Sequence, residues 1–269
     1  MTAIAVTVAG SDSSGGAGVQ ADLKTFSALG VYGASVFAAL TAQNTRGVTG
    51  ILDVPPDFVT AQFNAVYSDL TVGATKIGML SRTDVIEAVR AGLKRYQVHN
   101  VVLDPVMVAT SNDPLIDDAA VESLVELLFP LADLITPNLQ EVARILAVPV
   151  AETREEMSAQ AVRLKDMGPA AVLLKGGHGT SSQSVDLLLD EEGEHWLEAP
   201  RIDTRNTHGT GCTLSSAIAA GLAHGHDMIT AVRGAKAYVT AAIAAADTLE
   251  IGHGHGPVHH FHALWEKAK

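Results

Sequence analysis

The chain has 269 residues, of which 47% are hydrophobic and 18% are charged, enough apolar material for a sizeable core and too much for a disordered protein. Eighteen basic and 30 acidic residues give a formal net charge of −12, so the chain has no overall attraction for nucleic acid or an anionic membrane surface. The single cysteine, Cys212, excludes an intrachain disulfide and is typical of a reducing compartment. We therefore expect a cytoplasmic protein that binds neither nucleic acid nor membranes.

Neither a targeting segment nor a membrane span is expected. The chain begins with a short apolar run that reaches Gly10 without a basic leader. Two long apolar stretches, 215–224 and 231–247, are interrupted by a glycine and by charged residues, respectively. A membrane-spanning helix needs about 20 consecutive apolar residues, which neither stretch provides.

Predicted strands and helices alternate along the chain. Strands are predicted over 3–8, 34–39, 50–54, 74–77, 100–103, 134–136 and 171–174, followed by a hairpin of 185–189 and 195–199. Helices are predicted after the glycine-rich segment 10–18 as far as residue 28, and over 57–70, 83–96, 117–128, 139–146, 154–167, 213–224 and 227–248. This alternation indicates parallel βαβ units with helices on both faces of a sheet. Since no linker or internal repeat divides the chain, we expect one α/β domain over residues 1–269.

Polar or glycine-rich segments follow four of the predicted strands. These segments are 10–18, 104–107, 136–141 and 175–179. In open parallel sheets, ligands bind at the carboxyl ends of the strands. The sequence therefore predicts a polar cleft along one edge of the sheet.

The segment Gly209-Thr210-Gly211-Cys212 opens a predicted helix. Its glycines allow successive backbone N–H groups to point at one spot, and the helix N-terminus adds about half a positive charge. Such an anion hole suits a phosphoryl group during transfer. An isolated Gly-x-Gly is more often an ordinary turn before a buried helix, but Cys212 and the preceding Asn206, Thr207 and His208 favour the anion hole.

Cys212 has two interpretations. A thiol in the first turn of a helix tends toward a lowered pKa, which makes Cys212 a candidate base or polarising group. The alternative is a small buried apolar side chain.

The glycine-rich segment 10–18 resembles a phosphate loop, but two common types are disfavoured. It lacks the Gly-Lys-Ser/Thr ending of a P-loop, and it contains no Gly-x-Gly-x-x-Gly dinucleotide fingerprint. A substrate pocket lined by backbone is the better interpretation, with Asp22 as a polar contact from the following helix.

Asn138 and Glu141 also allow two interpretations, which the sequence leaves about even. Asn is a good helix N-cap, and Glu three residues later completes a capping box. The functional alternative places Glu141 beside a water bound to Mg²⁺ and Asn138 near phosphates. Asp104 offers a second carboxylate in the same zone, and Lys175 could reach a phosphate, although a surface lysine after a strand is commoner.

The segment 252–262 is rich in glycine and histidine. Histidine is a common metal ligand, but neither a cysteine nor a patterned carboxylate completes a site there. A loop without metal is favoured.

Several motifs together resemble the ribokinase-like superfamily, and within it the hydroxymethylpyrimidine/phosphomethylpyrimidine kinases of thiamine biosynthesis. The similarity covers essentially the whole chain. The motifs are Ala9–Asp12, Gln20–Phe26, Ala42–Val48, Lys76–Leu80, Leu103–Met107, Asn138-x-x-Glu141, Thr207–Cys212, Ala246–Leu249 and Gly256–Phe261.

The resemblance implies a three-layer α/β/α fold with a mostly parallel central sheet. It implies transfer of the γ-phosphoryl group of ATP to 4-amino-5-hydroxymethyl-2-methylpyrimidine, and then a second phosphorylation that gives the pyrophosphate. ATP and Mg²⁺ are the implied cofactors, and a homodimer is the implied assembly.

The resemblance also assigns roles to individual residues. Gln43 matches the glutamine that recognises the pyrimidine, as suits an amide that both donates and accepts hydrogen bonds. The positions expected to line the pyrimidine pocket are Gly10, Asp22, Met79 and Val106. Those expected on the nucleotide side are Asn138, Glu141, Lys175 and Thr207, with Mg²⁺ held near Asp104 and Glu141 through water. The anion hole is assigned to Gly209, Thr210 and Gly211.

Cys212 stands where most of the superfamily has an aspartate that deprotonates the substrate hydroxyl. The resemblance implies that Cys212 takes this role, although a thiolate pairs less well with Mg²⁺ than a carboxylate does.

Two other functions remain open from the sequence. Pyridoxal kinase is a sister activity on a similar hydroxymethyl group, alone or as a second specificity, and Gln43 favours the pyrimidine only moderately. A non-catalytic nucleotide-binding protein on the same fold is the more distant alternative, disfavoured by intact Asp104, Glu141 and Lys175. The polar segments 112–114 and 178–184 are candidate lids.

Overall fold

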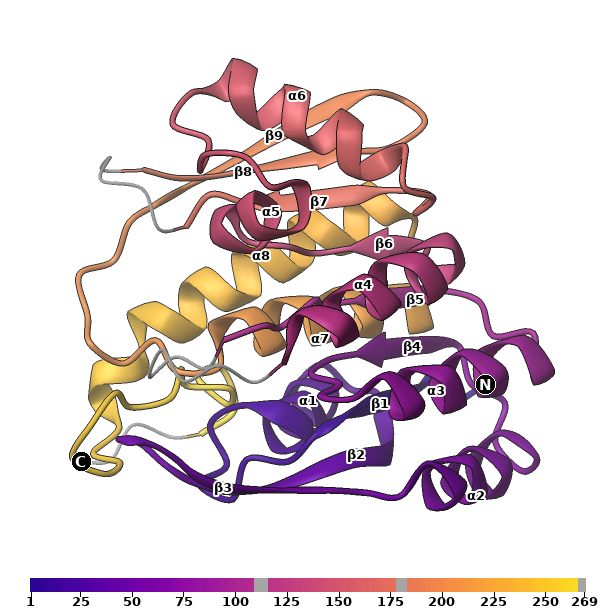
Figure 1. Ribbon diagram of the computed structural model, residues 1–269. Helices are drawn as coiled ribbons and strands as arrows, with labels where there is room; N and C mark the ends of the chain where they lie inside the picture. Colours follow the sequence, from indigo (N-terminus) through magenta and orange to yellow (C-terminus); the bar gives the residue numbers. More distant parts are fainter. Residues whose placement is uncertain (109–115, 178–182, 266–269) are drawn as a thin grey trace.

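The computed structural model describes residues 1–108, 116–177 and 183–265. Within them, nine strands form one sheet in the order β3-β2-β1-β4-β5-β6-β7-β8-β9 (Figure 1). The strands are β1 (Ile4–Gly10), β2 (Tyr32–Asn44), β3 (Gly47–Asp53), β4 (Ala74–Ile77), β5 (Val101–Leu103), β6 (Leu134–Ile135), β7 (Val172–Lys175), β8 (Gln183–Leu189) and β9 (Glu194–Pro200). The helices are α1 (Gly18–Ala28), α2 (Pro56–Tyr67), α3 (Thr83–Arg95), α4 (Asp118–Leu127), α5 (Leu139–Leu146), α6 (Arg154–Lys165), α7 (Thr210–Ala223) and α8 (Met228–Ala244).

The centre of the sheet is parallel and its two edges are antiparallel. Strands β2, β1, β4, β5, β6 and β7 run parallel to their neighbours. At one edge β3 returns antiparallel to β2, and at the other β8 and β9 form the predicted hairpin next to β7. The expectation of a mostly parallel sheet is confirmed, and the carboxyl ends of its central strands meet at one edge.

Two hydrophobic clusters cover the two faces of the sheet, because alternate residues of each strand point to opposite sides. Val101 and Leu103 of β5 belong to a cluster with α2 to α6, whereas Val102 belongs to a cluster with α1, α7 and α8. Figure 1 shows the same division of helices about the sheet. The three-layer α/β/α architecture is therefore confirmed.

Several predicted boundaries differ from the structure, among them those of β2, α7 and the last predicted helix. Strand β2 is much longer than the predicted 34–39, because its last residues extend beyond β1 and pair only with β3, outside the main core. Helix α7 begins at Thr210 instead of 213, since weak helix formers occupy its first turn. The predicted helix 227–248 ends at Ala244 and continues as a 3₁₀ turn.

No helix among the described residues is both long and apolar enough to cross a membrane. Of the two candidate lids, 112–114 and residues 178–182 of 178–184 lie outside the described part of the chain.

Candidate active site

A cavity of about 520 Å³ opens at the carboxyl ends of the central strands. Nearly all of the site residues expected from the sequence line it. They are Gly10, Gln43, Met79, Asp104, Val106, Asn138, Glu141, Lys175, Thr207, Gly209, Thr210, Gly211 and Cys212. The predicted cleft is therefore present, and it brings together segments from both halves of the chain.

Asp22 lies elsewhere than expected. Its carboxylate is fully buried beneath the cavity, where Thr7 and Ser216 donate hydrogen bonds to it and Lys76 forms an ion pair with it. Lys76 itself borders the cavity. Asp22 therefore reaches the cavity through Lys76 and does not line the cavity wall.

One end of the cavity is built by the start of α7. The N-cap residue Gly209 has a φ of 79°, and no side chain caps the helix. A Cβ at Gly209 would come within 1.9 Å of the carbonyl oxygen of Gly16. Glycine at position 209 therefore permits both the left-handed turn and the close approach of the glycine-rich loop. Because no side chain caps α7, the backbone N–H groups of its first turn face the cavity.

A buried ion pair faces that helix start. Lys175 Nζ lies 2.8 Å from Asp104 Oδ1, and Thr136 donates to the same oxygen. Lys175 Nζ also lies 3.4 Å from the position that a Cβ on Gly211 would occupy. The lysine is therefore next to the N-terminus of α7, where both supply positive potential.

The charges at this end of the cavity shift one another's pKa. Burial disfavours the charged forms of Asp104 and Lys175, but the attraction between them outweighs burial. The pKa of Asp104 is therefore lowered and that of Lys175 is raised. Burial raises the pKa of Glu141 to about 7, Lys175 offsets part of this rise, and Asp104 adds to it. Glu141 is thus the carboxylate whose charge is least well compensated by the protein.

The capping box predicted at Asn138 and Glu141 is confirmed. Asn138 Oδ1 accepts from the amides of Gln140 and Glu141, and Glu141 Oε2 accepts from the amide of Asn138. Both residues also line the cavity. The two interpretations of this motif are therefore compatible, because the box fixes the carboxylate at the cavity wall.

The residues expected near Mg²⁺ have suitable chemistry for that ion. Asp104 and Glu141 provide carboxylate oxygens, which Mg²⁺ prefers, and a nearby cation would relieve the buried charge of Glu141. Both oxygens of Asp104 already accept hydrogen bonds, from Thr136, Lys175 and Ser215. Contact of Asp104 with the ion through water fits this arrangement better than direct ligation.

Cys212 lies in the first turn of α7 and keeps partial exposure toward the cavity. The expectation of a lowered pKa is wrong for the structure without ligands. Burial raises the pKa of the thiol to about 11, and Lys76 offsets only part of that rise. The Gly18 amide donates to the thiol and also favours the thiolate, but desolvation outweighs both effects.

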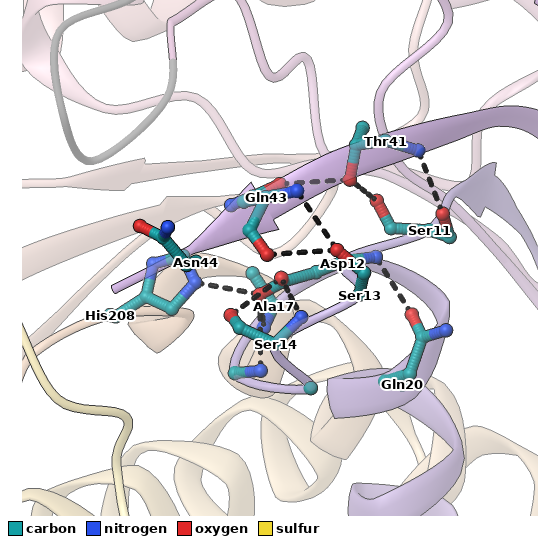
Figure 2. Close-up of polar contacts among 12 residues, drawn as sticks. Ser11, Asp12, Ser13, Ser14, Ala17, Gln20, Thr41, Gln43, Asn44 and His208 are labelled. Carbon is teal, nitrogen blue, oxygen red and sulfur yellow. Dashed lines mark hydrogen bonds and ion pairs between the residues drawn. The ribbon is translucent and has the colours of Figure 1, made fainter. Parts of the chain in front are cut away.

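The glycine-rich loop at the other end of the cavity is organised by Asp12 (Figure 2). Its carboxylate accepts from the amides of Ser14, Gly16 and Ala17, and its Oδ2 lies 2.7 Å from His208 Nε2. Burial would raise the pKa of Asp12, but the hydrogen bonds from His208 and Ser14 lower it to about 2. Asp12 therefore ties this loop to the segment that precedes α7.

Gln43 is fixed near the end of β2 by neutral contacts. The Ser13 hydroxyl donates to the backbone carbonyl of Gln43 and accepts from the backbone N–H of the same residue, both at 2.8 Å, as Figure 2 shows. Thr41 donates to the side-chain oxygen of Gln43 at 3.2 Å. The Ser13 bonds hold the Gln43 backbone, and the Thr41 bond orients its side chain at the cavity wall.

Sequence reasoning missed three groups at the cavity. Lys76 lies inside the fully buried strand β4, and only its charge in that position signals a special role. Asp12 and His208 are far apart in the sequence, and no local pattern indicates their contact. Lys236 on α8 pairs with Asp186 at 2.6 Å, and both line the cavity.

The histidine-rich segment packs against the cavity from outside. The amide of His255 donates to the Thr45 carbonyl in the β2–β3 turn, and the His208 amide donates to the Gly256 carbonyl. His260 is buried against Thr213, and burial lowers its pKa to about 3. The segment thus bonds to both ends of the cavity.

Comparison with known proteins agrees with the site. Residues 12–259 match the model of a family described as phosphomethylpyrimidine kinase. A hydroxymethylpyrimidine/phosphomethylpyrimidine kinase from Rhizobium meliloti is 58% identical over 99% of this chain and 100% of its own length. The enzyme of the same description from Escherichia coli is 56% identical over 97% of this chain and 98% of its own.

The fold agrees with solved structures as well. A Bacillus subtilis pyridoxal kinase in complex with ADP has a TM-score of 0.88 and 36% identity, and the match covers 97% of this chain and 98% of that one. With its family model, its relatives and its fold in agreement, the chain belongs to the phosphomethylpyrimidine kinase family and is a kinase.

Proposed function

We propose that this kinase transfers the γ-phosphoryl group of ATP to the hydroxymethyl group of 4-amino-5-hydroxymethyl-2-methylpyrimidine, and then phosphorylates the monophosphate to the pyrophosphate used in thiamine biosynthesis. The names of the relatives support both steps, and the ADP complex of the related pyridoxal kinase supports ATP as donor. One observation carries the proposal. The uncapped start of α7 and the Lys175–Asp104 pair face one cavity that Gln43 also lines.

The phosphates would bind at the α7 end. Backbone N–H groups of Gly209, Thr210 and Gly211 and the ammonium of Lys175 would hold the γ-phosphoryl oxygens, where negative charge is greatest during transfer. Thr207 and Asn138 line the same end and are proposed as further phosphate contacts. Asp104 keeps Lys175 charged and in place.

The pyrimidine would bind at the opposite end. The Gln43 side-chain amide can donate to a ring nitrogen through its NH₂ and accept from the amino group through its oxygen, and Gly10, Met79 and Val106 supply the surrounding walls. A Cβ on Gly10 would approach Met79 Cε to 2.7 Å, so glycine there leaves room for the Met79 side chain in the cavity wall.

Cys212 is the proposed base. Its thiol first loses its proton to solvent; the thiolate then takes the proton of the substrate hydroxyl while that oxygen attacks the γ-phosphorus and the bond to the β–γ bridging oxygen breaks, releasing ADP. Because the pKa of the thiol is raised to about 11, the reactive thiolate is a minor species at neutral pH. Turnover should therefore rise with pH.

Asp104 and Glu141 would hold Mg²⁺ at the phosphates, through water in the case of Asp104. When bound, the ion neutralises phosphate charge.

The test compares ATP consumption with three acceptors: the pyrimidine alcohol, its monophosphate and pyridoxal. We expect turnover with both pyrimidines. If neither the pyrimidine alcohol nor its monophosphate is phosphorylated, the proposal is contradicted. Turnover with the alcohol alone would remove only the second step. Cys212→Ala should abolish most turnover, and near-normal activity would exclude the base role. A Cys212→Asp variant that exceeds Cys212→Ala supports a positioned base.

Pyridoxal phosphorylation is the second candidate function. It is favoured by the structural likeness to the Bacillus subtilis pyridoxal kinase over 97% of this chain. Turnover with pyridoxal comparable to that with the pyrimidine would establish a dual specificity.

A cytoplasmic homodimer is proposed for the assembled enzyme. Exposed apolar side chains around β2, β3 and α2 support an interface there, with Leu52 66% and Phe58 60% exposed. Light scattering of the purified chain would distinguish a dimer from a monomer.

A further inference from the structure

A fully buried polar cluster lies beneath the cavity floor. Lys76 on β4, Asp22 on α1, Ser216 on α7 and Thr7 on β1 each have no exposed surface. Lys76 Nζ lies 2.9 Å from both carboxylate oxygens of Asp22, and the hydroxyls of Thr7 and Ser216 donate to that carboxylate at 2.6 Å. Two charges are thus held in the interior, where their desolvation is costly.

This cluster lies next to Cys212. Ser216 follows Cys212 by four residues on α7, so both side chains are on the same face of the helix, one turn apart. Lys76 and Cys212 both border the cavity, and their charges interact through space. The ion pair is therefore tied by the Ser216 hydrogen bond to α7, one turn from Cys212.

A buried ion pair is a weak source of stability, because apolar side chains of similar size usually serve as well. Its position beside the thiol suggests a different purpose. We propose that Lys76 is a positioning residue for the kinase reaction: its ammonium, fixed by Asp22, supplies the positive charge that stabilises the thiolate of Cys212. The inference rests on the proposed role of Cys212 as base.

The charged groups around the thiol support this assignment. Lys76 favours the thiolate, and so does Lys175 from β7, whereas the carboxylates of Asp22 and Asp104 oppose it. Lys76 is the largest of the charge effects on the pKa of the thiol. Both lysines are paired with a carboxylate, but Lys175 is assigned to the phosphate, which leaves Lys76 as the cation for the sulfur atom.

Alkylation of the intact chain by iodoacetamide tests the proposal without any substrate. Cys212 is the single cysteine, so the rate reports one thiol, and it is proportional to the thiolate fraction. At a pH below the pKa, Lys76→Met should react about tenfold more slowly, equivalent to about one pKa unit.

Two further variants separate charge from structure. Lys76→Arg keeps the charge and should restore most of the alkylation rate lost in Lys76→Met. Ser216→Ala removes a hydrogen bond to Asp22 without changing any charge and should alter the rate less than about twofold. If Lys76→Met does not fold, the double variant Lys76→Met/Asp22→Asn replaces it, and it should still react more slowly than the unmodified chain.

A folded Lys76→Met variant that reacts at the unmodified rate would overturn the proposal. In turnover assays, the rise of kcat with pH should shift to higher pH in Lys76→Met, whereas a purely structural defect would lower kcat at every pH. If the unmodified chain phosphorylates neither pyrimidine, the proposed function fails while the alkylation result still decides the link between Lys76 and Cys212.

Discussion

The two ends of the cavity are built from different interactions. At the glycine-rich end, Ser11, Ser13, Thr41 and Gln43 are joined by hydrogen bonds between hydroxyls, amides and backbone. At the α7 end, the charged groups Lys175, Asp104 and Glu141 meet within a buried wall. A neutral heterocycle is matched by the first arrangement and a phosphate by the second. A chain of net charge −12 can thus bind an anion with a few buried cations and backbone amides.

The largest effect is expected from removing the cation of the charged end. Lys175→Met should lower kcat by about 100- to 1000-fold, because a donor to the transferring group is lost. It should also lower the free energy of unfolding by about 3 kcal/mol, since Asp104 is left buried without its partner. Steady-state ADP release and urea unfolding measure the two effects.

Lys236→Met is the matched control for Lys175→Met. Its pair with Asp186 is about as buried as the Lys175–Asp104 pair, so the loss of stability should be similar. The fall in kcat should be less than about tenfold. Equal losses of kcat in the two variants would contradict a special role for Lys175.

The junction between the two ends should be the next most sensitive position. Gly209→Ala forces a side chain into a left-handed turn and against the Gly16 carbonyl, which should cost at least about 2 kcal/mol of unfolding free energy and disturb the anion hole. Gly225→Ala is the control, because Gly225 has a similar φ of 86° and open space around it. Calorimetry should show a loss of only about 1 kcal/mol there; a loss as large as at Gly209 would assign the effect to φ alone.

A smaller effect is expected at the neutral end. Gln43→Leu removes hydrogen bonds to the heterocycle and should raise the KM for the pyrimidine about 10- to 30-fold, equivalent to about 1.4–2 kcal/mol, with little change in the KM for ATP. Gln140→Leu changes an exposed glutamine at the opposite end and should leave the pyrimidine KM within about threefold. If Gln43→Leu instead raises the KM for ATP, the two ends have been assigned the wrong way round.

The smallest expected effect concerns the Asp12–His208 contact. The pKa of Asp12 is lowered from 3.8 in the unfolded chain to about 2 in the folded protein. The ionised carboxylate therefore stabilises the fold fully above pH 3.8, and this stabilisation is lost as the pH falls through about 2. After allowance for solvent screening, the contribution is about 1 kcal/mol. Urea unfolding from about pH 5 down to about pH 2 should show a steeper loss in the unmodified chain than in Asp12→Asn. Identical pH dependence would contradict the prediction.

Much of the fold could be predicted from the sequence because several central strands are short apolar runs between turn residues. Strands β5 and β7 are of this kind, and their burial on both faces makes the pattern plain. Strand β2 was predicted too short, since its end pairs with β3 away from the core, where apolar residues are not required. The start of α7 was missed by three residues because Gly211 is a weak helix former.

The candidate site could be predicted where a residue follows a strand, as with Asp104 and Lys175. It could not be predicted where the chemistry depends on tertiary contacts. The ion pair of Asp22 and Lys76 joins positions 54 residues apart, and the contact of Asp12 with His208 joins positions 196 residues apart. The direction of the Cys212 pKa shift also depends on burial, which local sequence around a helix start does not report.

The histidine-rich segment gives the C-terminal part of the chain an influence on both binding subsites. Its bonds run from Thr45, close to Gln43, to His208, which immediately precedes Gly209. Neither partner is close to the segment in the sequence. Truncation before residue 252 would therefore loosen the proposed pyrimidine end and phosphate end together, although none of the described residues 252–265 lines the cavity.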